Sequence, residues 1–192
     1  NWRKRGLILI VILEGLDNCG KNTLAHMLCE NYTDIIKIDF PDYKTDFGMF
    51  IKKKLFENDL SPISMQLLFS SERLSKAEYL RDISQNNLVI TTRYTYTAIA
   101  YGISRGIDKR LLEILENQMP KPDKKIFISI SAEESISRSR NPDVFERDFK
   151  LLKNVENEYK SIIVDEGDWY VVNGMSDIQS VYQDIKDIIF NS

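Results

Sequence analysis

The fold of this chain is decided by the stretch Glu14-Gly15-Leu16-Asp17-Asn18-Cys19-Gly20-Lys21-Asn22-Thr23. An apolar, β-branched run at 7–13 leads into it and is typical of a buried parallel strand, while the apolar spacing that follows predicts a helix. Gly15 and Gly20 bracket four residues and are followed by Lys21, which gives the G-x-x-x-x-G-K spacing of a phosphate-binding loop. The sequence therefore predicts a strand, a glycine loop and a helix that together bind an anion.

A loop of this kind binds phosphate mainly through its backbone. Glycines let the N–H groups turn inward onto the anion, the following helix adds the positive end of its dipole, and the lysine reaches the outer phosphates. A strand-to-helix turn that merely contains Gly-Lys is the alternative. We expect the loop to hold a nucleotide through Gly15, Leu16, Asp17, Asn18, Cys19, Gly20, Lys21, Asn22 and Thr23.

Position 22 departs from the usual pattern of such loops. A Ser or Thr normally follows the lysine and binds Mg²⁺ through its hydroxyl, whereas this chain has Asn22. An amide oxygen can approach a metal or its water shell, but an amide is bulkier than a hydroxyl. We expect Mg²⁺ to be bound through Asn22, Asp17 or Glu14.

Composition indicates one α/β domain over residues 1–192 and narrows the class of ligand. The chain is 43% hydrophobic and carries a net charge of −3, which argues against broad binding to nucleic acid or to a membrane surface. Cys19 and Cys29 lack metal-ligand spacing and are expected to be reduced thiols in the cytoplasm. The apolar run ends at Glu14 without a cleavage site, so neither a signal peptide nor a membrane span is expected.

Strand and helix patterns alternate along the rest of the chain. Further strands are predicted at 35–40, 87–92, 125–130 and 169–172. Helices are predicted at 23–32, 50–56, 62–77, 96–104, 111–117 and 178–190, and residues 132–163 are expected to be mostly helical with a break at Asn141-Pro142. This alternation predicts a central five-stranded parallel sheet flanked by helices, with the ligand at the carboxyl edge of the strands.

Further motifs occur in a fixed order along the chain. They are Phe40-Pro-Asp-Tyr43 with Thr45 and Gly48, Leu68-Phe-Ser-Ser-Glu-Arg73, Arg93-Tyr94 with Thr97 and Ala100-Tyr101, Pro120-Lys-Pro-Asp123, and the arginines Arg138, Arg140 and Arg147. Together with the glycine loop, they resemble the thymidylate kinases, a family of P-loop nucleoside monophosphate kinases, over nearly the whole chain. The Asn-Lys-x-Asp box by which a GTPase would read its base is not found in the sequence.

The resemblance implies a site for a nucleoside monophosphate. Phe69 and Arg73 lie four residues apart on one helical face, where an aromatic plane and a guanidinium can meet the same flat base. In the family this pair binds thymine; core packing and a surface ion pair are the alternatives. Arg93 is expected to hold the acceptor phosphate, and Tyr101 occupies the position from which relatives disfavour a ribose 2′-hydroxyl, with a plain buried aromatic as the alternative. The other acceptor-binding residues that the resemblance implies are Asp17, Phe40, Tyr43 and Thr97.

Two positions near the phosphates depart from the family pattern. Many relatives carry an arginine in the loop where this chain has Tyr43 and Lys44. The family usually reads Asp-Arg-Tyr where this chain reads Thr92-Arg93-Tyr94, which removes a carboxylate from the end of a central strand. Because Mg²⁺ prefers hard anionic oxygen, Glu14 and Asp17 are expected to compensate, and Asp17 is also expected to orient the acceptor or a magnesium-bound water.

The arginine-rich segment at about 135–150 is interpreted as a lid. Arg138, Arg140 and Arg147 would place positive charge over the transferring phosphoryl group while the segment excludes water. Asn18 offers no charge at a loop position that carries arginine in some relatives, which resembles the subgroup whose lid arginines serve instead. A solvated helical face is the alternative. The adenine of ATP is expected near Gly174, after the last strand.

The resemblance leads to one functional hypothesis and two alternatives. The chain is expected to be a magnesium-dependent kinase that moves the γ-phosphoryl of ATP to dTMP, giving dTDP and ADP. Its expected catalytic residues are Lys21, Asp17, Arg93, Arg138, Arg140 and Arg147. Relatives are homodimers, and the same is expected here, without nucleic-acid or membrane partners. A kinase for UMP, dUMP or another pyrimidine monophosphate is one alternative, and a nucleotide-binding module that has lost catalysis is the other.

Overall fold

Five parallel strands form the centre of the protein. The computed structural model describes residues 9–139 and 148–191, and these contain one sheet whose strands follow the order β2-β3-β1-β4-β5. Every pairing between neighbours in this sheet is parallel. The α/β fold expected from the sequence is confirmed. The strands are β1 (Leu9–Glu14), β2 (Ile35–Asp39), β3 (Leu88–Thr92), β4 (Lys124–Ser129) and β5 (Trp169–Asn173).

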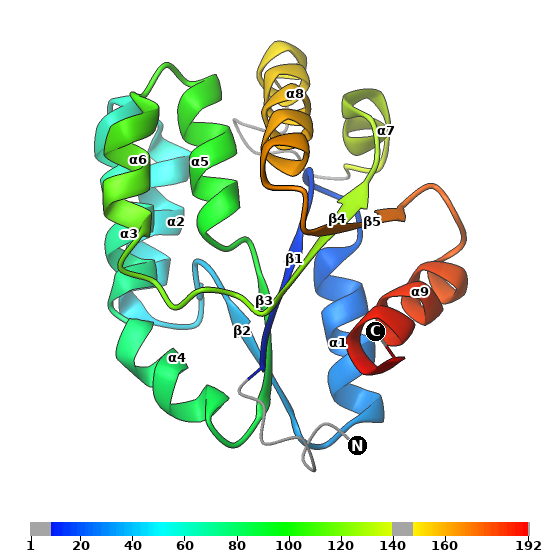
Figure 1. The fold of residues 1–192 in the computed structure, drawn as a ribbon. Coiled ribbons are helices and arrows are strands. Elements are labelled where there is room, and N and C mark those ends of the chain that lie inside the picture. The colour runs from blue at the N-terminus through cyan, green and yellow to red at the C-terminus, as the bar shows by residue number, and fades with distance from the viewer. Residues whose placement is uncertain (1–8, 140–147, 192) are drawn as a thin grey trace.

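Helices connect the strands and cover the sheet (Figure 1). In the figure, α1 and α9 lie together on one side of the sheet, whereas α3, α4, α5 and α6 lie on the other. The two termini of the described part lie near the opposite end of the molecule from α7 and α8. The described helices are α1 (Lys21–Asn31), α2 (Asp46–Glu57), α3 (Pro62–Leu74), α4 (Ala77–Ser84), α5 (Thr95–Ser104), α6 (Lys109–Glu116), α7 (Ala132–Ser137), α8 (Phe149–Glu166) and α9 (Ile178–Asn191).

The central strand β1 supplies side chains to two hydrophobic cores. Leu9, Val11 and Leu13 belong to the core that includes residues of α1, α8 and α9. Ile10 and Ile12 alternate with them and belong to the core that includes residues of α4. A strand buried on both faces reads as a continuous apolar run rather than an alternating one, which explains why β1 was recognisable in the sequence.

The carboxyl ends of three strands meet at one edge of the sheet. Leu13 of β1 is in register with Thr92 of β3, and Thr92 is in register with Asp39 of β2. The loop that follows β1 leads into α1 at the same edge. The glycine loop, Thr92 and Asp39 are therefore brought together from parts of the chain that are far apart in sequence.

The structure corrects one of the expected helices. The single helix expected over 62–77 is wrong, because α3 ends at Leu74 and a second helix, α4, runs from Ala77 to Ser84. The start of α3 is as expected: the side chain of Ser61 accepts a hydrogen bond from the backbone N–H of Ser64. The helical segment expected over 132–163 is divided into α7 and α8, and the Asn141-Pro142 break lies outside the described residues.

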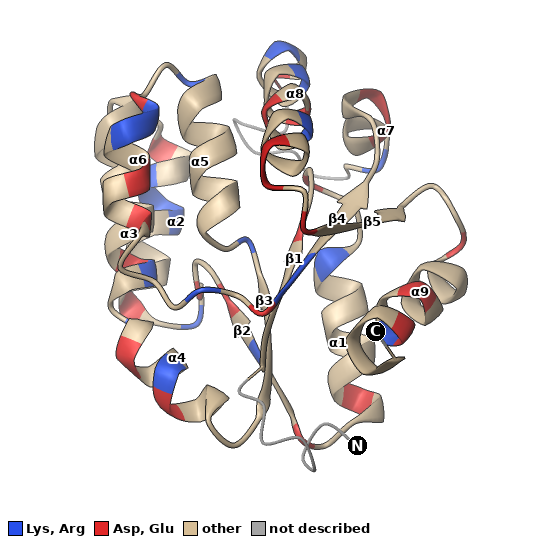
Figure 2. Ribbon diagram, in the orientation of Figure 1, with Lys and Arg blue, Asp and Glu red and all other residues tan. Residues whose placement is uncertain are grey.

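Charge is distributed without a broad basic face on the side drawn in Figure 2, where acidic and basic residues alternate along the helices. This pattern agrees with the net charge of −3. No helix among the described residues combines the length and the apolar character needed to cross a membrane. Cys19 and Cys29 are both free thiols.

Candidate active site

The glycine loop adopts a backbone that requires glycine at both ends. Gly15 has φ 144° and Gly20 has φ 98°, in the region that residues with a side chain rarely adopt. A Cβ on Gly15 would also lie 2.6 Å from the carbonyl oxygen of Ile128 in β4. The loop therefore passes close over the neighbouring strand and then turns directly into the N-terminus of α1.

Lys21 lies inside this loop rather than in solvent. Its Nζ donates hydrogen bonds to the carbonyl oxygens of Gly15, at 2.8 Å, and Leu16, at 2.6 Å. The side chain is almost fully buried, with 5% of the residue exposed, and its Nζ also lies 3.4 Å from Sγ of Cys19. The positive charge is therefore held at the centre of the loop, beside the positive end of the α1 dipole.

Helix α7 is hydrogen-bonded to the loop through Ser135. The hydroxyl of Ser135 donates to the backbone carbonyl of Asp17 at 2.7 Å, and Nδ2 of Asn18 donates to the carbonyl of Ser135 at 3.1 Å. Asn18 has φ 60°, which asparagine tolerates better than most residues. These two contacts connect the first residues of the expected lid segment to the loop.

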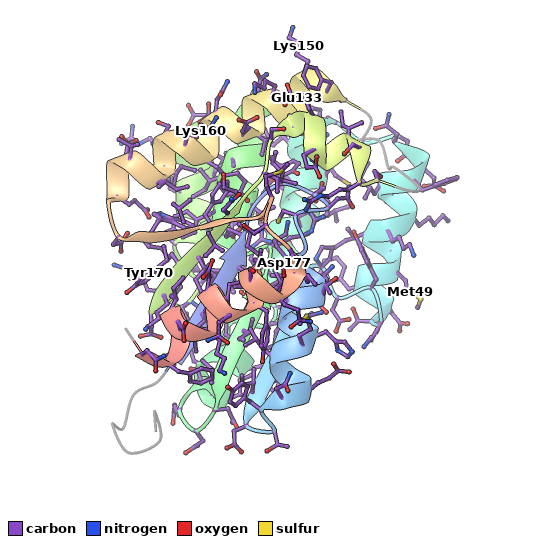
Figure 3. The ribbon with its side chains drawn as sticks, turned by 90° about the vertical axis from the view of Figure 1, so that its right-hand side faces the viewer. Met49, Glu133, Lys150, Lys160, Tyr170 and Asp177 are labelled. Atoms are coloured by element: carbon purple, nitrogen blue, oxygen red, sulfur yellow. The ribbon has the colours of Figure 1, made fainter. Side chains whose placement is uncertain are left out.

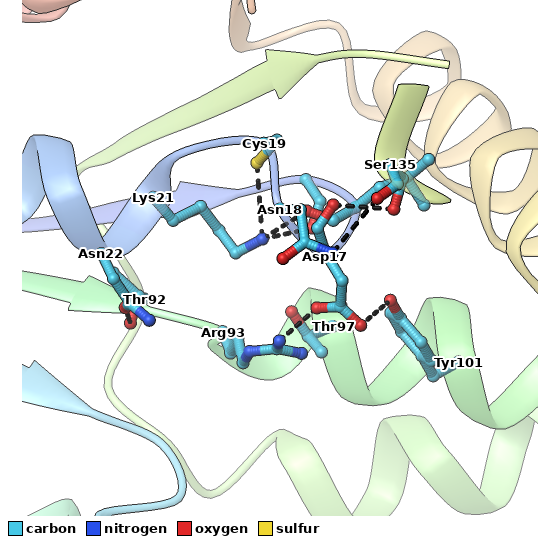
Figure 4. A network of polar contacts seen from close by, with 12 residues as sticks. Asp17, Asn18, Cys19, Lys21, Asn22, Thr92, Arg93, Thr97, Tyr101 and Ser135 are labelled. Atoms are coloured by element: carbon cyan, nitrogen blue, oxygen red, sulfur yellow. Dashed lines mark hydrogen bonds and ion pairs between the residues drawn. The ribbon is translucent and has the colours of Figure 1, made fainter. Parts of the chain in front are cut away.

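A charged network joins the loop to Arg93, which precedes α5, and to Tyr101 within α5, as Figure 4 shows. The Asp17 carboxylate pairs with the guanidinium of Arg93 and accepts a hydrogen bond of 2.9 Å from the hydroxyl of Tyr101. Burial alone would raise the pKa of Asp17, but the charges of Arg93 and Lys21, with the hydrogen bonds from Tyr101 and Arg93, lower it below its ordinary value. Asp17 is therefore ionised at neutral pH.

Arg93 is held in an unusual backbone conformation at the end of β3. Its φ is 62°, in the left-handed region that few residues other than glycine occupy. Burial opposes its positive charge, but the neighbouring carboxylate of Asp17 outweighs this effect and raises the pKa of Arg93. The side chain of Arg93 is still 35% exposed. Backbone strain of this kind concentrates at functional sites.

A cavity of about 430 Å³ opens beside Arg93. All of the residues that the sequence analysis assigned to acceptor binding line it, and the cavity brings together the loop, the segment after β2, α3 and α5. Figure 4 shows Asp17 and Tyr101 of this group in contact. The lining residues that were expected are Asp17, Phe40, Tyr43, Phe69, Arg73, Arg93, Thr97 and Tyr101.

The end of the cavity that Arg73 lines adjoins a buried ion pair. Arg73 of α3 donates from Nε and Nη2 to the two carboxylate oxygens of Glu116 in α6, at 2.8 and 3.0 Å. Both side chains are almost inaccessible, at 4% and 2% exposed. Burial opposes the charge of Arg73, but Glu116 raises its pKa. Ser70 donates to Glu116 and Gln66 donates to Ser70, which completes a polar network at this end.

Three polar side chains meet beside the loop at the near end of the cavity. The hydroxyl of Thr92 lies 3.1 Å from Oδ1 of Asn22 and 3.0 Å from Oδ1 of Asp39. The Nζ of Lys37 lies 2.7 Å from both carboxylate oxygens of Asp39. Figure 4 shows Asn22 and Thr92 side by side at the start of α1.

Glu14 is fully buried and has a structural role. Its Oε1 accepts hydrogen bonds from the backbone N–H groups of Tyr94, at 2.8 Å, and Thr97, at 3.2 Å, at the N-terminus of α5. Its Oε2 accepts from the hydroxyls of Thr97 and Tyr159. Glu14 thus caps α5 from a distant strand, and both of its oxygens are used within the protein, which disfavours the expected role as a magnesium ligand.

Arg138 is the one arginine of the expected lid that lies within the described residues. Its Nη2 donates to the carbonyl of Gly174 at 3.0 Å, and its Nε pairs with Glu134 at 2.6 Å. The contact brings together an arginine that was expected in the lid and a glycine that was expected near the adenine of ATP. Arg140 and Arg147 lie outside the described residues.

Several side chains at the site were not among the residues singled out in the sequence. Asp39 follows the same rule as Thr92, because both end a parallel strand at the carboxyl edge, and this signal was available. Gln66 lies one helical turn before Phe69 and was also accessible to a periodicity argument. Glu116 and Ser135 had no local signal, since each contacts the site across a long sequence separation.

The fold and this geometry define a class of protein. A glycine loop with a buried lysine is paired through Asp17 with an arginine that lines a cavity, and an aromatic ring and a second guanidinium line the same cavity. Such a site suits a P-loop kinase that transfers phosphate to a small phosphorylated acceptor.

Comparisons with known proteins identify the family. The family model described as thymidylate kinase matches residues 13–185. A probable thymidylate kinase of Saccharolobus solfataricus is 32% identical over 94% of this chain and 96% of its own length. The thymidylate kinase of Dictyostelium discoideum is 27% identical over 96% of this chain and 85% of its own length. The structure of thymidylate kinase from Candida albicans superposes with a TM-score of 0.80 at 27% identity, covering 94% of this chain and 90% of that one.

The chain belongs to the thymidylate kinase family. The family and the kinase class that the sequence predicted are thus confirmed.

Proposed function

We propose that the chain transfers the γ-phosphoryl of ATP to dTMP and that the described cavity holds the acceptor. The observation that carries this assignment is the position of Arg93, which pairs with Asp17 of the phosphate loop and also lines the cavity of about 430 Å³. An acceptor phosphate beside Arg93 would face the donor phosphates above Lys21. This places the two reacting groups at the junction of the loop and the cavity.

Lys21 and the loop backbone bind the donor in this proposal. The Nζ of Lys21 donates to two loop carbonyls, and such contacts can be exchanged for phosphate oxygens without moving the loop. The N-terminus of α1 adds its dipole. Arg138 donates to the carbonyl of Gly174, near which the adenine is expected.

Arg93, Phe69 and Arg73 bind the acceptor. Arg93 holds the phosphate, Phe69 provides a flat apolar surface for the base, and Arg73 presents its remaining N–H groups to a carbonyl oxygen of the base. The ring of Tyr101, fixed by its hydrogen bond to Asp17, lies along the sugar and opposes a 2′-hydroxyl. Asp17 keeps Arg93 and Tyr101 in position and orients the acceptor through them.

The side chains at the start of α1 suit Mg²⁺ as the metal partner of ATP. Hard oxygen donors are what Mg²⁺ prefers, and Asn22 and Thr92 present an amide oxygen and a hydroxyl oxygen there. Mg²⁺, when bound with ATP, would neutralise negative charge on the donor phosphates. The protein side chains supply the remaining positive charge through Lys21 and Arg93, with Arg138, Arg140 and Arg147 proposed as lid arginines.

A homodimer is supported by apolar side chains exposed on helices α2, α3 and α6. Helix α3 contacts both α2 and α6, so the three helices are neighbours in the fold. Figure 3 shows Met49 of α2 pointing away from the body of the protein. A surface of this kind marks an interaction site. Its exposed apolar residues are Met49, Phe50, Phe56, Ile63, Leu67 and Ile114. Light scattering should give twice the chain mass of 22.4 kDa, and Leu67→Glu should give the monomer.

The choice of acceptor is tested by turnover. ADP release is measured with ATP and Mg²⁺ while dTMP, dUMP, UMP, dCMP and dGMP are offered separately, with Lys21→Ala as the blank. Turnover highest on dTMP and lost in the blank is the expected result. Preference for UMP or dUMP would favour a kinase of another pyrimidine monophosphate. Nucleotide binding without turnover on any acceptor would favour the binding module and contradict the proposal.

A further inference from the structure

Three oxygen-bearing side chains from three different elements converge beside the phosphate loop. Asn22 lies in the first turn of α1, Thr92 ends β3 and Asp39 ends β2. Thr92 Oγ1 lies within 3.1 Å of Asn22 Oδ1 and 3.0 Å of Asp39 Oδ1. The parallel register that pairs Asp39 with Thr92 fixes this arrangement.

The hydroxyl of Thr92 cannot satisfy both neighbours at once. A hydroxyl carries one proton, whereas the two nearest atoms of Asn22 and Asp39 are both acceptor oxygens. One of these oxygens therefore keeps its lone pairs available to a further donor. Water molecules bound to Mg²⁺ are donors of this kind, and Mg²⁺ usually keeps several of its waters in protein sites.

Asp39 is the carboxylate best placed to accept hydrogen bonds from water molecules bound to Mg²⁺. Among the described residues that line the cavity, the other carboxylates are Asp17 and Asp42. Asp17 is buried and paired with Arg93. Asp42 lies beyond the cavity-lining Phe40-Pro41 turn, and its Oδ1 accepts from the backbone N–H of Lys44 at 3.0 Å. Asp39 alone of the three contacts Thr92, which in turn contacts the residue after Lys21.

Lys37 forms an ion pair with Asp39 but does not hold the Asp39 side chain rigidly. The Nζ of Lys37 lies 2.7 Å from the carboxylate, and the two side chains are 24% and 40% exposed. An ion pair of this exposure is weak, and lysine is a compact charge on a flexible stem. Asp39 can therefore exchange this partner for a hydrated cation while remaining ionised.

We propose that Asp39 holds the hydrated magnesium ion of the donor nucleotide, with Asn22 and Thr92 as neutral oxygen partners. The inference rests on the proposed function, since it deepens the donor site of the kinase. It assigns the metal-side carboxylate to the end of β2 rather than to β1 or to the loop.

The test measures the effect of Mg²⁺ on ADP affinity, and so does not depend on turnover. Calorimetric titrations with ADP are made with and without Mg²⁺. The affinity of the wild type for ADP with Mg²⁺, divided by its affinity without Mg²⁺, is the enhancement ratio. In Asp39→Asn this ratio is expected to fall by about 10- to 100-fold, the loss typical of residues that orient a metal site. ADP without Mg²⁺ should bind Asp39→Asn at least as tightly as the wild type, because a negative charge near the phosphates is removed.

Matched variants separate this role from a structural one. Lys37→Met removes the ion pair but keeps the carboxylate, so its ratio should equal or exceed that of the wild type. Asp42→Asn removes a carboxylate of the same cavity and should keep the ratio. Asp39→Asn combined with Thr92→Asp places a carboxylate one side chain away and should restore much of the ratio. Thermal unfolding checks that each variant is folded, and Asp39→Ser replaces Asp39→Asn if that variant is unfolded.

An unchanged ratio in folded Asp39→Asn would overturn the assignment, as would a wild type whose ADP affinity does not respond to Mg²⁺. Equal losses in Asp39→Asn and Lys37→Met would also overturn it, because they would show that the ion pair matters rather than the carboxylate. Failure of the proposed function looks different. In that case no monophosphate is turned over, while the enhancement ratio and its dependence on Asp39 are still measured.

Discussion

The two ends of the acceptor cavity hold their charges in different ways. At the base end, Arg73 and Glu116 form a two-point ion pair whose side chains are 4% and 2% exposed. At the phosphate end, Arg93 remains 35% exposed although its partner Asp17 is buried. The first pair is fixed inside the protein, whereas the second has a face that an arriving phosphate can reach.

This difference suggests a division of labour within one site. A buried, fully paired guanidinium cannot move without leaving a charge unpaired, so in the proposed function Arg73 presents a fixed set of donors to a base. A partly exposed guanidinium can share its donors between a carboxylate and a phosphate, so Arg93 can respond to ligand. In the proposed function, the base end therefore offers the base a fixed arrangement of donors, and the phosphate end offers the phosphate a positive charge that can adjust to it.

Removing Glu116 should have the largest effect on stability. Glu116→Ala leaves the Arg73 guanidinium buried without its partner, which is expected to lower the free energy of unfolding by about 3–5 kcal/mol. Urea denaturation measures it. Glu113→Ala is the control on the same helix, because Glu113 is exposed and lies 3.9 Å from Lys109. That control should change stability by less than about 0.5 kcal/mol. Equal stability of the two variants would show that the buried pair is not what fixes the base end.

Removing Arg93 should act on turnover more than on folding. Arg93→Ala is expected to lower kcat by about 10²- to 10³-fold, as loss of a preorganised donor to a developing charge does. Steady-state kinetics with dTMP measures this, and thermal unfolding measures the accompanying stability change. A near-normal kcat in a folded Arg93→Ala variant would contradict the role of the phosphate end.

Tyr101 sharpens the comparison because it lines the same cavity and its hydroxyl donates to Asp17 at the phosphate end. Tyr101→Ala opens space beside the sugar and should reduce the preference for dUMP over UMP by about tenfold, the scale of a small steric contact. These acceptors differ only in the 2′-hydroxyl, so the ratio of their kcat/KM values isolates the effect. Tyr101→Phe keeps the ring and should keep the preference. Loss of preference in Tyr101→Phe would point to the hydroxyl and its bond to Asp17 instead.

The smallest effect is expected from the titration of Asp17. Its pKa is lowered in the folded protein, so the stability that ionised Asp17 contributes is present above its unfolded pKa of about 3.9 and is lost as the pH falls through the folded value. The difference in unfolding free energy between wild type and Asp17→Asn should therefore be constant from about pH 5 to 8 and shrink below about pH 4. A difference that instead grew on acidification would contradict the lowered pKa.

Much of the fold and part of the site were predictable from sequence, for physical reasons. The run that forms β1 and the glycine spacing after it are local signals, and both fix a strand, a loop and a helix. The four-residue spacing of Phe69 and Arg73 also placed both side chains at one cavity. The separation of α3 from α4 was missed. The two residues between these helices are Ser75 and Lys76, and neither is a glycine or a proline that would mark a break.

The partners of the predicted residues were harder to foresee. Glu116 pairs with Arg73 across 43 residues, and Glu14 caps α5 across 80 residues or more. Such contacts depend on how helices and strands pack, which periodicity does not encode. Asp39 was overlooked for a different reason: its place near the carboxyl end of a predicted strand was visible in the sequence, but its contact with Thr92 depends on the register of β2 and β3.

The central claim is that one nucleotide spans both ends of the cavity, with its phosphate at Arg93. The most direct test is calorimetric binding of dTMP and of thymidine, which lacks the phosphate, to the wild type and to Arg93→Ala. The account predicts that Arg93→Ala weakens dTMP by about tenfold or more, as loss of a charge-assisted hydrogen bond does, and leaves thymidine nearly unchanged. Equal weakening of both ligands, or no weakening of dTMP, would contradict it.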